Sequence, residues 1–162
     1  MSGIVSNASP LIVLAKADLL ALLPKLFTEV AIPQAVRDEI MAGPESDPMR
    51  RSLPDCSWLR VVKLDPPLSP LAAMQLGRGE AEVIECAQRN TGWAVLLDDR
   101  AGRRAARALG LRVFGTLSVV AVASQEGHIE SFDTAAKRLR SAGLYASDQL
   151  LQEVRQRLQS QG

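Results

Sequence analysis

Residues 93–114 read WAVLLDDRAGRRAARALGLRVF, and this stretch decides the fold class. The apolar run 93–97 predicts a buried strand, and the run 111–114 predicts another. Between them, Arg100–Leu109 has the pattern of a helix, which ends at Gly110. A strand, a helix and a strand in direct succession predict two parallel strands joined by a crossover helix.

The same alternation runs through the rest of the chain. Further strands are expected at 3–6, 29–32 and 59–64, and helices at 10–17, 18–27, 33 to about 43, and 80–90. Three more helices are expected to start near Thr116, Ser131 and Ser147, whereas 44–57 is rich in Pro, Ser and charge and predicts a loop. We therefore predict a three-layer α/β/α sandwich with a mostly parallel sheet of about five strands. It would be a single domain over residues 1–162, with a core at about 3–115 and C-terminal helices at about 116–160.

Composition limits the classes of partner. The 162 residues are 47% apolar and carry a net charge of +1, so nucleic-acid binding would need a local basic patch. No signal peptide or membrane-spanning run is visible, and Cys56 and Cys86 are isolated, which predicts reduced thiols in a cytoplasmic protein without a membrane partner. The single histidine, His128, is far in sequence from the acids, so no Ser-His-Asp or Cys-His system is predicted.

Four polar residues are placed where strand and helix ends should meet. Asn7 and Asp98 directly follow predicted strands, and Glu39 and Glu80 lie on predicted helices. Ligands of open parallel sheets bind outside the carboxyl ends of the strands. Carboxylates gathered there repel one another unless a cation lies between them, and Mg²⁺ and Mn²⁺ prefer oxygen ligands. The pattern therefore predicts a divalent-metal site suited to phosphodiester chemistry.

Helical periodicity separates the acids that face this site from those that do not. Glu80 heads the buried stripe of its helix, whereas Glu82 shares the opposite face with Glu85 and Arg89 and is expected to be solvated. Glu39 borders the buried side of its own helix. Each acid also has a purely structural interpretation, because a carboxylate at a helix N-terminus is stabilised by the helix dipole.

Two neighbouring acids, Asp98 and Asp99, are harder to separate. We favour Asp98 as a metal ligand and Asp99 as the cap of the following helix, and the reverse assignment remains open. The hydroxyls of Ser9 and Thr116 are secondary candidates for the site, with helix capping as the favoured alternative role.

The order and spacing of four motifs resemble the PIN domain, the metal-dependent nuclease fold of VapC-type bacterial toxins. The motifs are IVSNASPLIVLAKADLLALL at 4–23, IPQAVRDEI at 32–40, GEAEVIECA at 79–87 and VLLDDR at 95–100. Asp98 follows Glu80 by 18 residues, a spacing typical of that family. The SNASPLI and LLDDRAGRR segments are most similar to a PIN-like subgroup of prokaryotic proteins with no assigned function.

The resemblance implies a Mg²⁺- or Mn²⁺-dependent endoribonuclease, the toxin of a type II toxin–antitoxin pair. Glu39, Glu80 and Asp98 would be the catalytic acids and would hold the metal with Asn7, and with Asp99 if the neighbouring acids exchange roles. By the same resemblance, the partners would be an RNA substrate, a small antitoxin protein and a second copy of the chain in a homodimer.

Asn7 departs from the family pattern, which normally has an Asp at this position. An amide oxygen can ligate a hard cation but brings no charge, so weaker metal binding is expected. The alternative is a PIN-like domain that has lost catalysis and serves as an RNA- or protein-binding module. A receiver-like phosphotransfer domain is disfavoured, because the paired acids it needs after the first strand are replaced by Ser6 and Asn7.

A basic stripe follows the predicted acid site. It comprises Arg100, Arg103, Arg104 and Arg107, spaced i, i+3, i+4 and i+7 along one helix. These side chains could bind RNA phosphates, with a solvated helix face as the alternative. The aromatic residues are too few and scattered in sequence to predict a base-stacking platform.

The C-terminal helix is predicted to be amphipathic. Its apolar residues Leu150, Leu151, Val154 and Leu158 fall on one face. Packing against the domain is the favoured interpretation, and a subunit or antitoxin contact is the second.

Overall fold

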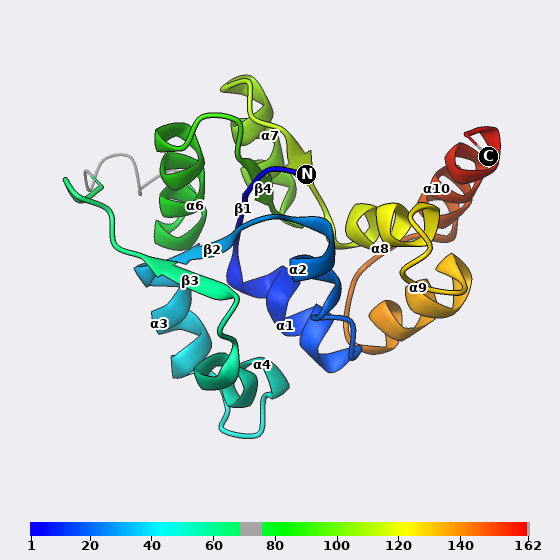
Figure 1. Cartoon of the computed structure of the whole chain (residues 1–162), viewed down its shortest axis with the longest axis horizontal. Coiled ribbons are helices and arrows are strands. Elements are labelled where there is room, and N and C mark those ends of the chain that lie inside the picture. The colour runs from blue at the N-terminus through cyan, green and yellow to red at the C-terminus, as the bar shows by residue number, and fades with distance from the viewer. Residues whose placement is uncertain (69–75, 162) are drawn as a thin grey trace.

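The protein has a five-stranded, all-parallel sheet covered by helices, which confirms the predicted fold class (Figure 1). The computed structural model describes residues 1–68 and 76–161. The strands are β1 (Ile4–Ser6), β2 (Val30–Pro33), β3 (Leu59–Val62), β4 (Ala94–Leu96) and β5 (Val113–Phe114). Their order across the sheet is β3-β2-β1-β4-β5.

Helices make the two outer layers of the sandwich. They are α1 (Ala8–Lys16), α2 (Leu22–Leu26), α3 (Gln34–Ala42), α4 (Pro48–Ser52), α6 (Arg78–Arg89), α7 (Arg100–Ala108), α8 (Thr116–Gln125), α9 (Phe132–Ser141) and α10 (Asp148–Ser160). Figure 1 shows α6 and α7 on one side of the sheet and α1, α2 and α8 on the other. The three C-terminal helices begin at or next to the positions predicted from the sequence.

The strands β1, β2 and β4 are short apolar runs because both faces of the sheet are covered there. Ile4 and Val5 of β1 and Leu96 of β4 are completely buried. Val5 lies opposite Ala31 on one side and Val95 on the other, so β1 is the centre of the sheet. Burial of these side chains supplies much of the free energy that holds the layers together.

The order of strands reverses direction at β1 and β4, and this position is where open parallel sheets bind ligands. Asn7 follows β1 directly, and its backbone N–H donates to the carbonyl oxygen of Leu96 in β4 at 3.1 Å. The acids Asp98 and Asp99 follow β4 on the same edge. The topology therefore brings the first and fourth sequence motifs side by side.

The expected loop at 44–57 is wrong in its centre, which contains α4 and a 3₁₀ turn at Leu53–Asp55. Asp47 caps α4 by accepting from the backbone N–H of Met49 at 2.9 Å, and Met49 is fully buried. The helix has five residues and shows too little periodicity to be recognised among prolines and charges.

Two predicted helix starts are also wrong. The first helix begins at Ala8 with Asn7 in the N-cap position, so Ser9 is an exposed residue of the first turn and not a cap. The next helix covers Leu22–Leu26 instead of 18–27, because Asp18 has a φ of 56° that a helix does not accept.

No helix within residues 1–68 and 76–161 combines the length and the apolarity that crossing a bilayer requires.

Candidate acidic site at the carboxyl edge of the sheet

Asn7 occupies the N-cap position of α1 but does not cap it. Its side-chain Nδ2 donates instead to Oε1 of Glu80 on α6, at 3.1 Å. The side chain is 5% exposed, and in the described part of the chain its Oδ1 is a buried acceptor with no hydrogen-bond partner. An N-cap Asn normally accepts a bond from the first helical turn, and an unpaired buried acceptor is rare. Asn7 is therefore oriented toward the acids at the expense of its local helix.

Glu39 of α3 and Glu80 of α6 converge beside Asn7. A Cβ atom added to Gly79 would lie 3.2 Å from Asn7 Oδ1 and 3.5 Å from Glu39 Oε2, so this glycine keeps a small space open between the two oxygens. The acids border a hollow of about 350 Å³ that Gly77 and Arg78 also line. Motifs two and three meet at this hollow.

The two glutamates repel each other. The pKa of Glu39 is raised above its ordinary value, first by partial burial and second by the negative charge of Glu80. Carboxylates held together against their mutual repulsion are a common property of functional sites. A cation between them would remove this repulsion.

Glu82 is not solvated, and the expectation for this residue is corrected. Its side chain is 7% exposed, and its Oε2 accepts from the backbone N–H of Ala35 at 3.1 Å while Oε1 pairs with Arg78. Ala35 is in the first turn of α3, where Pro33 occupies the N-cap position and has no side-chain acceptor. Glu82 thus caps α3 from a different helix and fixes α3 against α6.

Asp98 is bonded to the start of α8. Its Oδ1 accepts from the backbone N–H of Thr116 at 2.8 Å, and its Oδ2 accepts from the Thr116 hydroxyl. Thr116 is the first residue of α8, so Asp98 satisfies the N-terminus of that helix. The hydroxyl of Thr116 therefore contacts Asp98, and Thr116 is not a helix N-cap.

Asp99 is the cap of α7, as predicted. Its Oδ2 accepts from the backbone N–H of Gly102 at 2.8 Å. A Cβ on Gly102 would lie 3.5 Å from Asp99 Oδ2 and 3.5 Å from Glu80 Cγ, so Asp99 and Glu80 both border this glycine.

The donor chemistry of these residues can be compared with what a divalent cation requires. Across the described ranges 1–68 and 76–161, no three His, Cys, Asp or Glu side chains gather closely enough to hold a metal ion. Glu39 and Glu80 nevertheless supply two carboxylates, and the unpaired Oδ1 of Asn7 supplies a neutral oxygen. Oxygen donors with a combined negative charge fit Mg²⁺ or Mn²⁺ in chemical type.

A comparison with protein families agrees with this fold and this set of motifs. The family described as DUF3368, PIN domain, matches residues 3–160. The chain belongs to this PIN-domain family. Among curated proteins, none matches it. As a PIN domain, the chain falls within a superfamily of nuclease type, and the match includes the C-terminal helices.

The four arginines of the basic stripe differ in their exposure to solvent. Arg100, Arg104 and Arg107 are exposed on α7, whereas Arg103 is half-buried and lies beside Asp98 and Gly115. The pKa of Arg103 is lowered by burial and by the charge of Arg107, and Asp98 opposes this effect. Within the described residues none of these four arginines forms an ion pair, and the three exposed ones are accessible to an anionic ligand.

Sequence reasoning missed the capping role of Glu82 and the contact between Asp98 and Thr116. One signal for the first was present, because Pro33 before α3 leaves that helix without a local cap. Glu85 and Arg89, which share one face of α6, form an ion pair at 2.7 Å. Helical periodicity assigned Glu82 and Glu85 to the same face of α6. It could not reveal that α3 covers the part of that face where Glu82 lies.

Proposed function

We propose that this PIN domain is a divalent-metal-dependent endoribonuclease. The observation that carries the proposal is the buried Oδ1 of Asn7, an acceptor without a partner among the described residues, next to the carboxylates of Glu39 and Glu80. A buried acceptor beside two mutually repelling acids is best explained by a cation that all three contact.

Asn7, Glu39 and Glu80 would hold Mg²⁺ or Mn²⁺, joined by Asp99 or Asp98 from the end of β4. When bound, the cation would activate a water molecule and offset charge on the phosphate. The protein would do the rest by positioning. Glu82 holds α3 against α6, and the arginines of α7 would bind the phosphates on either side of the scissile bond.

The test is cleavage of RNA by the purified chain, with Mg²⁺ or Mn²⁺ and with EDTA. We expect cleavage that requires the cation and falls at least about 100-fold in Glu80→Gln, which keeps the shape of the side chain and removes its charge. Glu85→Gln is the matched control, since Glu85 lies on the same helix and pairs only with Arg89 among the described residues. Cleavage that persists in EDTA or in Glu80→Gln would refute the proposal.

At a finer level, we propose that the chain is the toxin of a type II toxin–antitoxin pair, silenced by a small antitoxin and active as a homodimer. This rests on the resemblance to VapC-type toxins alone. Expression of the chain should arrest bacterial growth, and Glu80→Gln should abolish the arrest. Light scattering of the purified protein would test the homodimer, for which a mass of twice 17.5 kDa is expected.

A second candidate is a PIN domain that has lost catalysis and binds RNA or protein. The Asn7–Glu80 hydrogen bond favours it, because the amide occupies a carboxylate oxygen that a cation would otherwise use. The variant Asn7→Asp separates the two functions. If the natural protein is inactive and Asn7→Asp creates metal-dependent cleavage, the natural chain is the degenerate form.

A further inference from the structure

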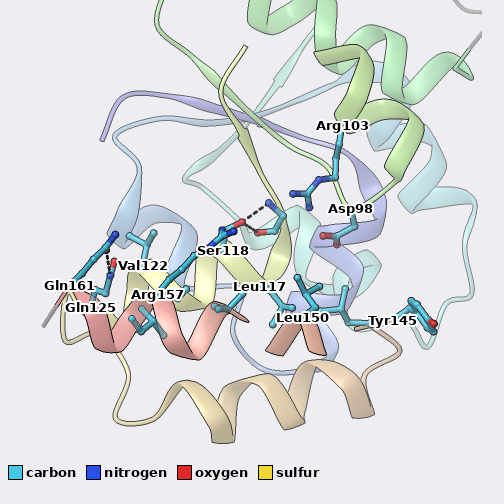
Figure 2. A pocket seen from close by; sticks show the side chains of 15 residues that line it. Asp98, Arg103, Leu117, Ser118, Val122, Gln125, Tyr145, Leu150, Arg157 and Gln161 are labelled. Carbon is cyan, nitrogen blue, oxygen red and sulfur yellow. Dashed lines mark hydrogen bonds between the residues drawn. The ribbon is translucent and has the colours of Figure 1, made fainter. Parts of the chain in front are cut away.

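A second hollow includes Asp98 in its lining and is not used by the proposed chemistry. It is a cavity of about 470 Å³ between α8 and α10, and Asp98 and Arg103 lie at one end of it. Figure 2 shows Tyr145 and Leu150 toward this same end, whereas Gln125 and Gln161 lie at the other. The two glutamines are joined by a hydrogen bond of 2.7 Å. Asp98 and Gly115, which follow β4 and β5, place the other end of the cavity at the carboxyl edge of the sheet.

The walls of the cavity are apolar and partly exposed to solvent. Leu117, Val122, Val154 and Leu158 line it, and two of the largest exposed apolar side chains of the described chain lie on its rim. These are Tyr145, which is 95% exposed, and Leu150, which is 41% exposed. Exposed apolar side chains that gather at a hollow indicate a binding site, since isolated ones are scattered over a protein surface.

The charges around the cavity favour an anionic ligand. Arg103 and Arg157 line it, and among the described residues neither forms an ion pair. Asp98 is the one acid in the lining, and both of its carboxylate oxygens accept hydrogen bonds from Thr116. A ligand in the cavity would thus meet apolar walls, an exposed aromatic ring and two available guanidinium groups.

We propose that this cavity is a subsite for one nucleotide of single-stranded RNA, with the base against Tyr145 and Leu150 and its phosphate at Arg103. The proposal rests on the proposed ribonuclease function and deepens it by naming a nucleotide subsite and the residues that form it. Arg103 belongs both to the cavity and to the basic stripe of α7, so a strand bound along the stripe reaches the cavity directly.

The geometry selects a single strand because a base must leave its stack to enter a hollow of this kind. Unpaired bases stack on aromatic side chains and on guanidinium planes, whereas the bases of a duplex are already stacked and paired. A hollow of about 470 Å³ is within the range that holds small ligands. In this proposal a single exposed aromatic residue, Tyr145, supplies the stacking surface.

The test is fluorescence anisotropy with a short labelled RNA strand, its duplex, and a strand of equal length whose sugars lack bases, all in EDTA so that no cation supports cleavage. Tyr145→Ala should weaken binding of the normal single strand roughly 5- to 50-fold, with little effect on the abasic strand or the duplex. Tyr145→Phe should restore binding. Val61→Ala is the control, since Val61 is an exposed apolar residue on β3 at the opposite edge of the sheet.

The outcomes separate the subsite from the nuclease function. RNA cleavage by the natural chain with no dependence on Tyr145 would overturn the subsite alone. Binding that depends on Tyr145, without hydrolysis when Mg²⁺ is restored, would support the subsite and remove the nuclease function. If Tyr145→Ala leaves RNA affinity unchanged but alters the mass measured by light scattering, the cavity is a protein interface and the nucleotide proposal fails.

Discussion

Glu82 accepts a hydrogen bond of 3.1 Å from the backbone N–H of Ala35, and this contact joins the two helices that carry Glu39 and Glu80. Because α3 begins after a proline, it has no side-chain cap of its own, and the carboxylate of α6 supplies one. The distance between the two acids of the candidate site therefore depends on a third acid that contacts neither of them in its hydrogen bonds.

Replacing Glu82 should destabilise the protein because a cap is lost, and not because a surface charge is lost. Glu82→Ala leaves the N–H of Ala35 without its acceptor and should lower the free energy of unfolding by about 1–3 kcal/mol. Divalent-metal affinity should fall as well, since α3 is no longer fixed against α6. Urea unfolding and calorimetry measure both quantities. Glu82→Gln keeps an acceptor, so its stability and metal affinity should lie between those of the natural protein and Glu82→Ala. The control Glu85→Ala should change both quantities little. Equal effects at positions 82 and 85 would exclude the capping role.

Neutralising Glu39 should stabilise the metal-free protein. The folded state raises the pKa of Glu39 above its ordinary value of 4.5, so the folded state binds more protons than the unfolded state in that window. Stability is thus lost as pH rises through the raised pKa. Glu39→Gln removes this penalty and should raise the melting temperature by about 1–2 °C at neutral pH, a small effect because solvent screens the exposed part of the side chain.

Added metal should make the natural protein melt at a higher temperature than Glu39→Gln. Mg²⁺ should raise the melting temperature of the natural protein and have no such effect on Glu39→Gln, because the cation needs the charge that the variant lacks. Asp38→Asn, a neighbour on α3 that bonds to Gln34, is the control. A melting temperature of the metal-free protein that drops in Glu39→Gln would show that the two carboxylates do not repel each other.

Adding one methyl group at Gly79 should fill the space between the site oxygens. The new Cβ would lie 3.2 Å from Asn7 Oδ1, closer than ordinary contact, in a helix where alanine is otherwise favoured over glycine. Gly79→Ala should therefore lower metal affinity about tenfold while the protein stays folded by circular dichroism. Unchanged affinity would mean that the cation does not contact Asn7.

The neighbouring acids Asp98 and Asp99 should respond differently. Asp98→Asn disturbs the N-terminus of α8, as does Thr116→Val, and each should lower the free energy of unfolding by about 1–2 kcal/mol with metal affinity nearly unchanged. Asp99→Asn should weaken metal binding, because Asp99 and Glu80 both border Gly102. Calorimetry on the variants decides this, and a larger loss of affinity in Asp98→Asn would show that Asp98 leaves Thr116 to bind the metal.

Much of the fold could be predicted because its signals are local. The strands of 93–114 and the intervening helix follow from an apolar run, a helical period and Gly110, and each element is present within one to two residues of the predicted bounds. The short helix α4 could not be found this way, since Met49 is buried by packing against other elements and not by a periodic pattern of its own.

The sequence by itself determined the α/β class, the parallel sheet and the meeting of Asn7, Glu39 and Glu80, because period, chain order and the ends of parallel strands fix which residues share one edge. Only the tertiary structure decided which acids turn toward that edge. Asp98 and Asp99 are adjacent and chemically identical, yet one bonds to Thr116 and the other borders Gly102 together with Glu80. Glu82, two residues after Glu80, is buried because α3 packs over it. The direction of a side chain depends on neighbours distant in sequence, and no local period contains that information.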